Sequence, residues 1–128
     1  MSLELLSPIE NEVLVGFSLL PKQIIGKNIQ LHTLSKGLPD LKGLQIAIVG
    51  LEEQRNSFFN NTQYNVNQFR RAFYELFPGN WNINIADLGN LPNGENVEDS
   101  YFAVKEIASN LKQMNIIPIF IGGSHDLI

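Results

Sequence analysis

The 128-residue sequence contains no cysteine, which excludes disulfide frameworks, zinc sites built on thiolates and cysteine nucleophiles. Basic residues are few as well: nine lysines and arginines stand against thirteen aspartates and glutamates, giving a formal charge of −4. This balance argues against a surface that binds nucleic acid or anionic lipid. We therefore expect neither a nucleic-acid partner nor a membrane partner.

Long hydrophobic runs are also missing. No stretch approaches the roughly 18 apolar residues of a membrane-spanning helix. The first residues, Met1-Ser2-Leu3-Glu4, do not show the basic and apolar segments of a secretory signal. We therefore expect a cytoplasmic protein. The 44% of hydrophobic residues and 17% of charged residues are typical of a folded globular chain.

Three short runs predict strands, at 46–50, 83–89 and 116–121, and the continuous apolar run at 46–50 is typical of a strand buried on both faces. Two helical patterns lie between them. The first contains Phe69, Phe73 and Phe77, which we interpret as core, and Pro78-Gly79 ends it. The second runs from Val97 to Leu111 with charged residues on its other side. Strands that alternate with helices predict a parallel sheet covered by helices on both faces.

The first 43 residues show no such regularity, although 28–34 alternates polar and apolar residues as a half-buried strand does. We predict an N-terminal extension over 1–43 and a βαβαβ unit over 44–128. Three main strands are few for a doubly wound α/β fold, and no covering helix follows the third one. We therefore expect an incomplete domain, the N-terminal part of a longer protein.

Ligands of open parallel sheets bind beyond the carboxyl ends of the strands, so the loops that follow the three strands are the candidate site. The most informative loop contains Gly122, Gly123, Ser124, His125 and Asp126. Two glycines let the backbone turn sharply and approach a ligand closely. A histidine after them suits a metal ligand. Structural roles are open too, because Ser124 can cap a following helix and Asp126 can complement its dipole.

The other two loops carry acidic residues. Glu52 and Glu53 follow the first strand and either face a substrate amine or solvate their loop. For Asp87, at the end of the second strand, hydrogen bonds to loop amides are the favoured role. We expect His32 to be a surface residue. Arg70-Arg71 falls on the polar side of its helix, which favours a solvated face or a local salt bridge.

The run Ile117-Pro118-Ile119-Phe120-Ile121-Gly122-Gly123-Ser124-His125-Asp126-Leu127 resembles the first metal motif of the ureohydrolase family, P-[IVL]-x-[IVL]-G-G-x-H. Arginase, agmatinase and formimidoylglutamase belong to this family. Three other segments of 44–128 agree in order and spacing. Ile46-Ala47-Ile48-Val49-Gly50 resembles the opening strand of the family, Phe69-Arg70 with Phe73-Tyr74 resembles its I-R-x-x-L-Y helix, and Ile85-Ala86-Asp87-Leu88-Gly89-Asn90 is similar to its D-x-G-D strand.

The resemblance implies an arginase-like three-layer α/β/α fold and a hydrolase of guanidino or formimino C–N bonds. In this family two Mn²⁺ ions share a bridging hydroxide that attacks the substrate carbon. His125 would be a ligand of one Mn²⁺. The other ligands come from D-x-H-x-D and D-x-D motifs, which do not occur in these 128 residues. Since one imidazole holds Mn²⁺ poorly, we expect this chain alone to bind no metal and to be inactive.

Two departures from the family pattern bear on the subtype. Ser124 stands where arginases and agmatinases usually have aspartate, and with Asp126 after the histidine this looks more like the formimidoylglutamase branch. Asn60-Asn61-Thr62-Gln63 replaces the usual glycine-rich segment of the first loop, which leaves the substrate open. The alternative is a non-catalytic α/β binding or scaffold module. We also expect a homo-oligomer, because the third strand should leave an apolar edge exposed.

Overall fold

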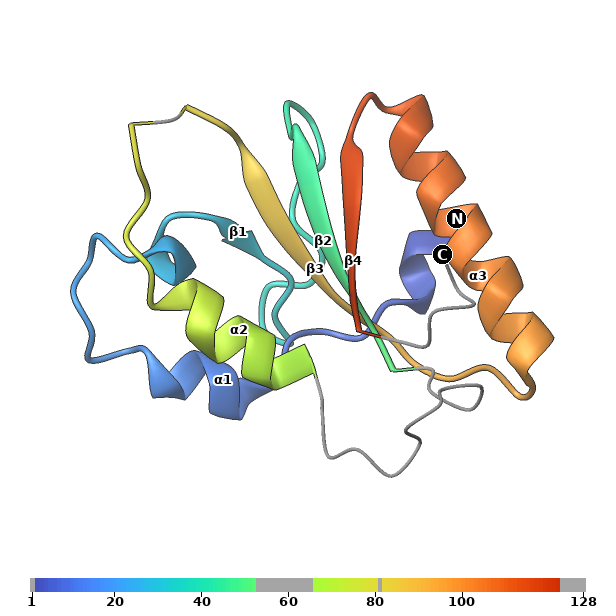
Figure 1. Ribbon diagram of the computed structural model, residues 1–128, viewed down its shortest axis with the longest axis horizontal. Helices are drawn as coiled ribbons and strands as arrows, with labels where there is room; N and C mark the ends of the chain where they lie inside the picture. The colour runs from blue at the N-terminus through green and yellow to red at the C-terminus, as the bar shows by residue number, and fades with distance from the viewer. Residues whose placement is uncertain (1, 53–65, 81, 123–128) are drawn as a thin grey trace.

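The computed structural model describes residues 2–52, 66–80 and 82–122 (Figure 1). In chain order the elements are η1 (Ser2–Leu5), α1 (Asn11–Gly16), η2 (Ile25–Lys27), β1 (Gln30–Leu31), β2 (Ile46–Leu51), α2 (Val66–Tyr74), β3 (Ile85–Leu91), α3 (Val97–Gln113) and β4 (Ile117–Gly122). None of the helices in these ranges has the length and apolar character needed to cross a membrane.

The four strands form one sheet in the order β1-β3-β2-β4, and every pair is parallel. The predicted α/β class with a parallel sheet is therefore confirmed. The three main strands lie within two residues of their predicted ranges. The alternating segment 28–34 contributes only the two residues of β1, which pair with Ala86 and Asp87 at the edge of the sheet.

The helices lie on both faces of the sheet (Figure 1). On one face α3 and η1 pack against the strands, because the alternate side chains of β2 and β3 point to that face. The buried cluster there consists of Leu3, Leu6, Leu44, Ala47, Val49, Leu51, Ala86, Leu88, Leu91, Val104, Ile107, Leu111 and Ile116. On the other face α2 packs with α1 and η2. The N-terminal residues Leu3 and Leu6 thus share a core with the main strands.

Helix α2 departs from the sequence expectation. Its buried residues are Val66, Asn67, Arg70 and Tyr74. The prediction that the phenylalanines form core is wrong for Phe77, which is 65% exposed, and only partly right for Phe69 and Phe73, which are half-buried. The helix ends at Tyr74, four residues before Pro78. The face that turns inward is rotated by about one residue from the aromatic stripe, because Arg70 has a partner in the sheet.

Candidate functional site

The carboxyl ends of the three main strands lie together at one edge of the sheet. Leu51 is in register with both Leu91 of β3 and Gly122 of β4. The backbone N–H of Glu52 donates to the Leu91 carbonyl at 3.3 Å. These strand ends thus mark the edge at which parallel sheets bind ligands.

The structure places two of the predicted site residues at this edge. Glu52 is exposed directly after β2, and Gly122 is the last residue of β4, with a φ of 88° that favours glycine. The other predicted residues lie outside the described ranges: Glu53, Gly123, Ser124, His125 and Asp126.

A bulge in β3 shapes the site. Ile48 is in register with Asp87 and Gly50 with Asn90, so Leu88 and Gly89 of β3 lie opposite the single residue Val49 of β2. Gly89 adopts a φ of 93°, a conformation that side chains rarely permit. Because of the extra residue, the side chains of Asp87 and Asn90 both reach Arg70 of α2.

Arg70 and Asp87 form a fully buried ion pair. Nε of Arg70 donates to Oδ2 of Asp87 at 2.8 Å and Nη2 donates to Oδ1 at 2.9 Å, and both side chains are 0% exposed. Burial lowers the pKa of Arg70, but the hydrogen bonds and the charge of Asp87 raise it overall, so the guanidinium stays charged. The expectation that Arg70 lies on a polar helix face is therefore wrong. It holds for Arg71, which pairs with Glu12 at 2.9 Å on the surface.

Two further donors satisfy the Asp87 carboxylate. The hydroxyl of Tyr74 donates to Oδ2 at 2.5 Å, and the Gly89 amide donates to Oδ1 at 3.1 Å. The amide contact agrees with the role favoured for Asp87 from sequence. Burial, followed by the charge of Asp87, raises the pKa of Tyr74 far above its ordinary value. Asp87 is thus neutralised by a cation and held by four hydrogen bonds, which is a structural role.

Asn90 connects this buried pair to the exposed edge. Its Oδ1 accepts from Nη1 of Arg70 at 2.6 Å, and its Nδ2 donates to Oε2 of Glu52 at 3.1 Å. Gly50 makes room for it, since a Cβ at that position would lie 2.2 Å from the Asn90 Oδ1. The side chain of Asn90 therefore crosses β2 over a glycine and reaches the carboxylate that follows the strand.

His32 contradicts the sequence expectation of a surface residue, because only 7% of it is exposed. Its Nδ1 lies 2.8 Å from the Leu88 carbonyl, and its backbone N–H donates to the Asp87 carbonyl at 2.9 Å. Since a carbonyl only accepts, Nδ1 carries the proton. The Ile9 amide donates to the His32 carbonyl at 2.9 Å. His32 thus ties the N-terminal segment to the bulge in β3.

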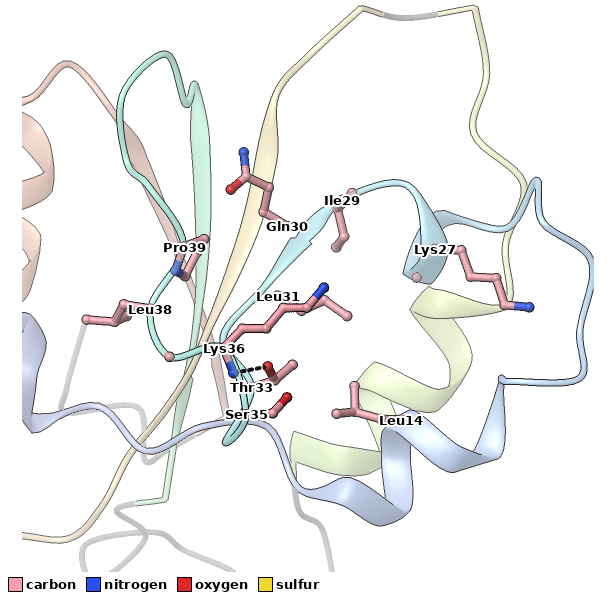
Figure 2. A pocket seen from close by; sticks show the side chains of 12 residues that line it. Leu14, Lys27, Ile29, Gln30, Leu31, Thr33, Ser35, Lys36, Leu38 and Pro39 are labelled. Carbon is pink, nitrogen blue, oxygen red and sulfur yellow. Dashed lines mark hydrogen bonds between the residues drawn. The ribbon is translucent and has the colours of Figure 1, made fainter.

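A hollow of about 510 Å³ lies beside the edge strand β1 (Figure 2). Leu14, Ile29, Leu31 and Leu38 give it apolar walls, and the chain of Lys36 extends across it. The ammonium of Lys27, also at its wall, donates to the Ser18 and Leu20 carbonyls at 2.9 and 2.6 Å. The hollow is built from the N-terminal segment and is separate from the edge that carries Glu52.

The described residues do not form a manganese site by themselves. Within 2–52, 66–80 and 82–122 there is no group of three histidine, aspartate or glutamate side chains that could hold a metal ion. In these ranges the exposed carboxylates after β2 and β3 are those of Glu52, of Glu95 and of Glu98 and Asp99 in the first turn of α3, while Asp87 is already paired with Arg70. Mn²⁺ needs several oxygen and nitrogen ligands, so this part of the chain does not fit it.

Sequence reasoning missed Arg70, Tyr74 and Asn90 as members of one network. One signal was present: an aspartate inside an otherwise apolar strand needs a partner when it is buried. Comparisons of the chain with family models, with curated proteins and with solved structures found no match. A functional conclusion therefore depends on the residues of this chain.

Proposed function

We propose that this chain is the N-terminal portion of a binuclear manganese-dependent ureohydrolase with an arginase-like three-layer α/β/α fold. The enzyme would cleave a guanidino or formimino C–N bond of a small molecule in the cytoplasm, and it is closest to the formimidoylglutamase branch. His125 is proposed as a ligand of one Mn²⁺, with Gly122, Gly123, Ser124 and Asp126 shaping its loop.

The observation that carries the proposal is the contact between two separate segments of the resemblance. Arg70 and Tyr74 belong to the helical segment that resembles I-R-x-x-L-Y, and Asp87 belongs to the segment that is similar to D-x-G-D. Their side chains form one buried hydrogen-bonded group. Each of these motifs is weak alone. Their contact supports the interpretation that they are parts of one pattern, since such a pair must occur together to be buried.

The position of β4 gives further support. This strand carries the most specific part of the resemblance, and it lies beside β2 with its carboxyl end next to Leu51. The carboxyl end of β4 therefore lies at the edge where ligands of parallel sheets bind.

A non-catalytic α/β binding or scaffold module is the second candidate. The observation that favours it is the burial of Asp87, the carboxylate of the segment similar to D-x-G-D, in an ion pair with Arg70, which gives this residue a structural role. A homologue that has lost its metal ligands would look the same in this part of the chain.

The metal content of the longer protein separates the two candidates. Purified with added Mn²⁺ and dialysed, the enzyme should retain two manganese ions per chain, and His125→Ala should retain one or fewer. His32→Gln is the control, because His32 is the other histidine of the sequence and lies at the bulge of β3. A wild-type protein without manganese, or a His125→Ala variant with both ions, would overturn the proposal.

A further inference from the structure

We infer that Glu52 binds the cationic amidine group of the substrate, and that Asn90 and Arg70 are positioning residues that hold its carboxylate at the sheet edge. The substrate class rests on the proposed function. The positions of the three residues do not depend on it.

Three side chains form a line from the interior to the edge. Arg70 is 0% exposed, Asn90 is 8% exposed, and Glu52 is exposed. The contacts along this line are 2.6 Å from Nη1 of Arg70 to Oδ1 of Asn90 and 3.1 Å from Nδ2 of Asn90 to Oε2 of Glu52. An exposed carboxylate on a flexible side chain is usually free to turn, but this one is attached to a buried group.

The orientation of Asn90 is fixed from two sides. Arg70 uses Nε and Nη2 on Asp87, which leaves Nη1 for the Asn90 oxygen. The amide oxygen must face this donor, so the amide NH₂ must face outward. Gly50 and Val66 confine the side chain, since a Cβ at Gly50 would lie 2.2 Å from Asn90 Oδ1 and 2.8 Å from Val66 Cγ1. The donor that meets Glu52 is therefore determined by the core.

The charges along the line leave Glu52 unbalanced in the described part of the chain. Arg70 and Asp87 neutralise each other. Asn90 is neutral, and no lysine or arginine among residues 2–52, 66–80 and 82–122 forms an ion pair with Glu52. The negative charge of Glu52 is thus not offset by a lysine or arginine of the described residues, and a cationic ligand group would offset it.

An amidinium or guanidinium group matches this carboxylate. Both are planar cations with pairs of N–H donors that fit the two oxygens of a carboxylate. The Asn90 donor uses one lone pair of Oε2, and each carboxylate oxygen offers two. A carboxylate that is already oriented loses less conformational freedom when such a ligand binds.

The test is an NMR titration of the 128-residue chain with formamidinium chloride, the simplest amidinium. Saturable shifts of the Glu52 backbone amide and the Asn90 side-chain amide are expected in the wild type. Glu52→Gln should weaken the apparent affinity about fivefold or more. Glu52→Asp keeps the charge but is too short for the Asn90 contact, and it should also weaken binding. Glu106→Gln, an exposed position on α3, should leave the titration unchanged.

Asn90→Ala tests the positioning role directly, with its fold checked by its amide spectrum. Formamidinium should then bind more weakly although Glu52 is intact, whereas sodium chloride at equal concentration should not reproduce the wild-type shifts. If Glu52→Gln or Glu52→Asp binds as the wild type does, or if sodium gives the same shifts, the inference is wrong.

The longer protein distinguishes this inference from the proposed function. There, Glu52→Gln should raise KM more than it lowers kcat, because the carboxylate binds substrate. If the enzyme is active and Glu52→Gln leaves its KM unchanged, the inference is wrong and the proposed function still stands. Formamidinium binding at Glu52 without any manganese-dependent hydrolysis would refute the proposed function alone.

Discussion

Arg70 and Asp87 join helix α2 to strand β3 through a bidentate ion pair in the interior of the protein. Both side chains are 0% exposed, and the two N–O distances are 2.8 and 2.9 Å. A buried pair of this kind need not add net stability over an apolar pair, but removing one partner leaves a buried charge. Arg70 of α2 therefore contacts both Asp87 and Asn90 of β3, so it helps to orient the helix and the Asn90 side chain.

Replacing the guanidinium should be costly. Arg70→Met leaves the Asp87 carboxylate buried without a cation, and we expect a loss of about 3–5 kcal/mol in the free energy of unfolding, measured with urea. The control is Arg71→Met, which breaks only the half-exposed pair with Glu12 and should cost less than about 1 kcal/mol. A loss below 1 kcal/mol for Arg70→Met would show that the pair does not hold α2.

The raised pKa of Tyr74 predicts a loss of stability in alkali. Burial, and then Asp87, keep its hydroxyl protonated in the folded state, above the ordinary pKa of 10.0 that applies once it is unfolded. Stability from this group is complete below pH 10 and falls as pH rises further, by about 1.4 kcal/mol per pH unit. Urea unfolding between pH 8 and about pH 11 measures this slope.

Tyr74→Phe is the matched variant for the alkaline slope. It should lose about 1–3 kcal/mol at neutral pH, because Asp87 loses the 2.5 Å hydrogen bond. Above pH 10 its stability should fall less steeply than that of the wild type. Equal slopes for the two proteins would mean that another group causes the alkaline loss.

Gly50 should not tolerate a side chain. The Cβ of Gly50→Ala would lie 2.2 Å from Asn90 Oδ1 and 2.8 Å from Val66 Cγ1, so we expect a loss of about 1–3 kcal/mol. Gly16→Ala is the control, because nothing lies within 4 Å of its added Cβ, and it should be neutral or slightly stabilising. If thermal unfolding shows that Gly50→Ala is as stable as Gly16→Ala and the wild type, the argument for a close approach at Gly50 is wrong.

Strand β4 should mediate self-association of the 128-residue chain. Ile117 is 62% exposed and Ile119 is 40% exposed on this edge strand. The backbone N–H and C=O groups of Ile117 and Ile119 face β2, to which they are paired. Those of Phe120 face away from β2, where another chain can pair with them. Ile119→Lys should shift sedimentation velocity profiles toward monomer, whereas Leu19→Lys, at a 99% exposed loop position, should not. A wild type that is monomeric at every concentration would contradict this.

The strands and their order of succession follow from the sequence because continuous apolar runs are a local signal. The runs at 46–50 and 116–121 are recognisable as strands from their own residues. In the structure each end of these strands differs from the predicted end by one residue at most. The parallel pairing also follows, since a strand that returns through a helix must run the same way. The candidate edge was predictable for the same reason.

The buried network was not predictable from a local pattern. Arg70 and Asp87 are 17 residues apart, and their contact depends on how α2 docks on β3. The register of Asn90 depends on a bulge that exists only once β2 and β3 pair. The burial of His32 depends likewise on the Leu88 carbonyl, which lies 56 residues further along the chain.

The rate at which the longer protein releases free amine from N-formimino-glutamate in the presence of Mn²⁺ tests the central claim most directly. We predict saturable hydrolysis that disappears when manganese is removed by a chelator, returns when it is restored, and is abolished or sharply reduced by His125→Ala. Hydrolysis that is absent with formimino and guanidino substrates alike, or that is unchanged by His125→Ala, would contradict the account.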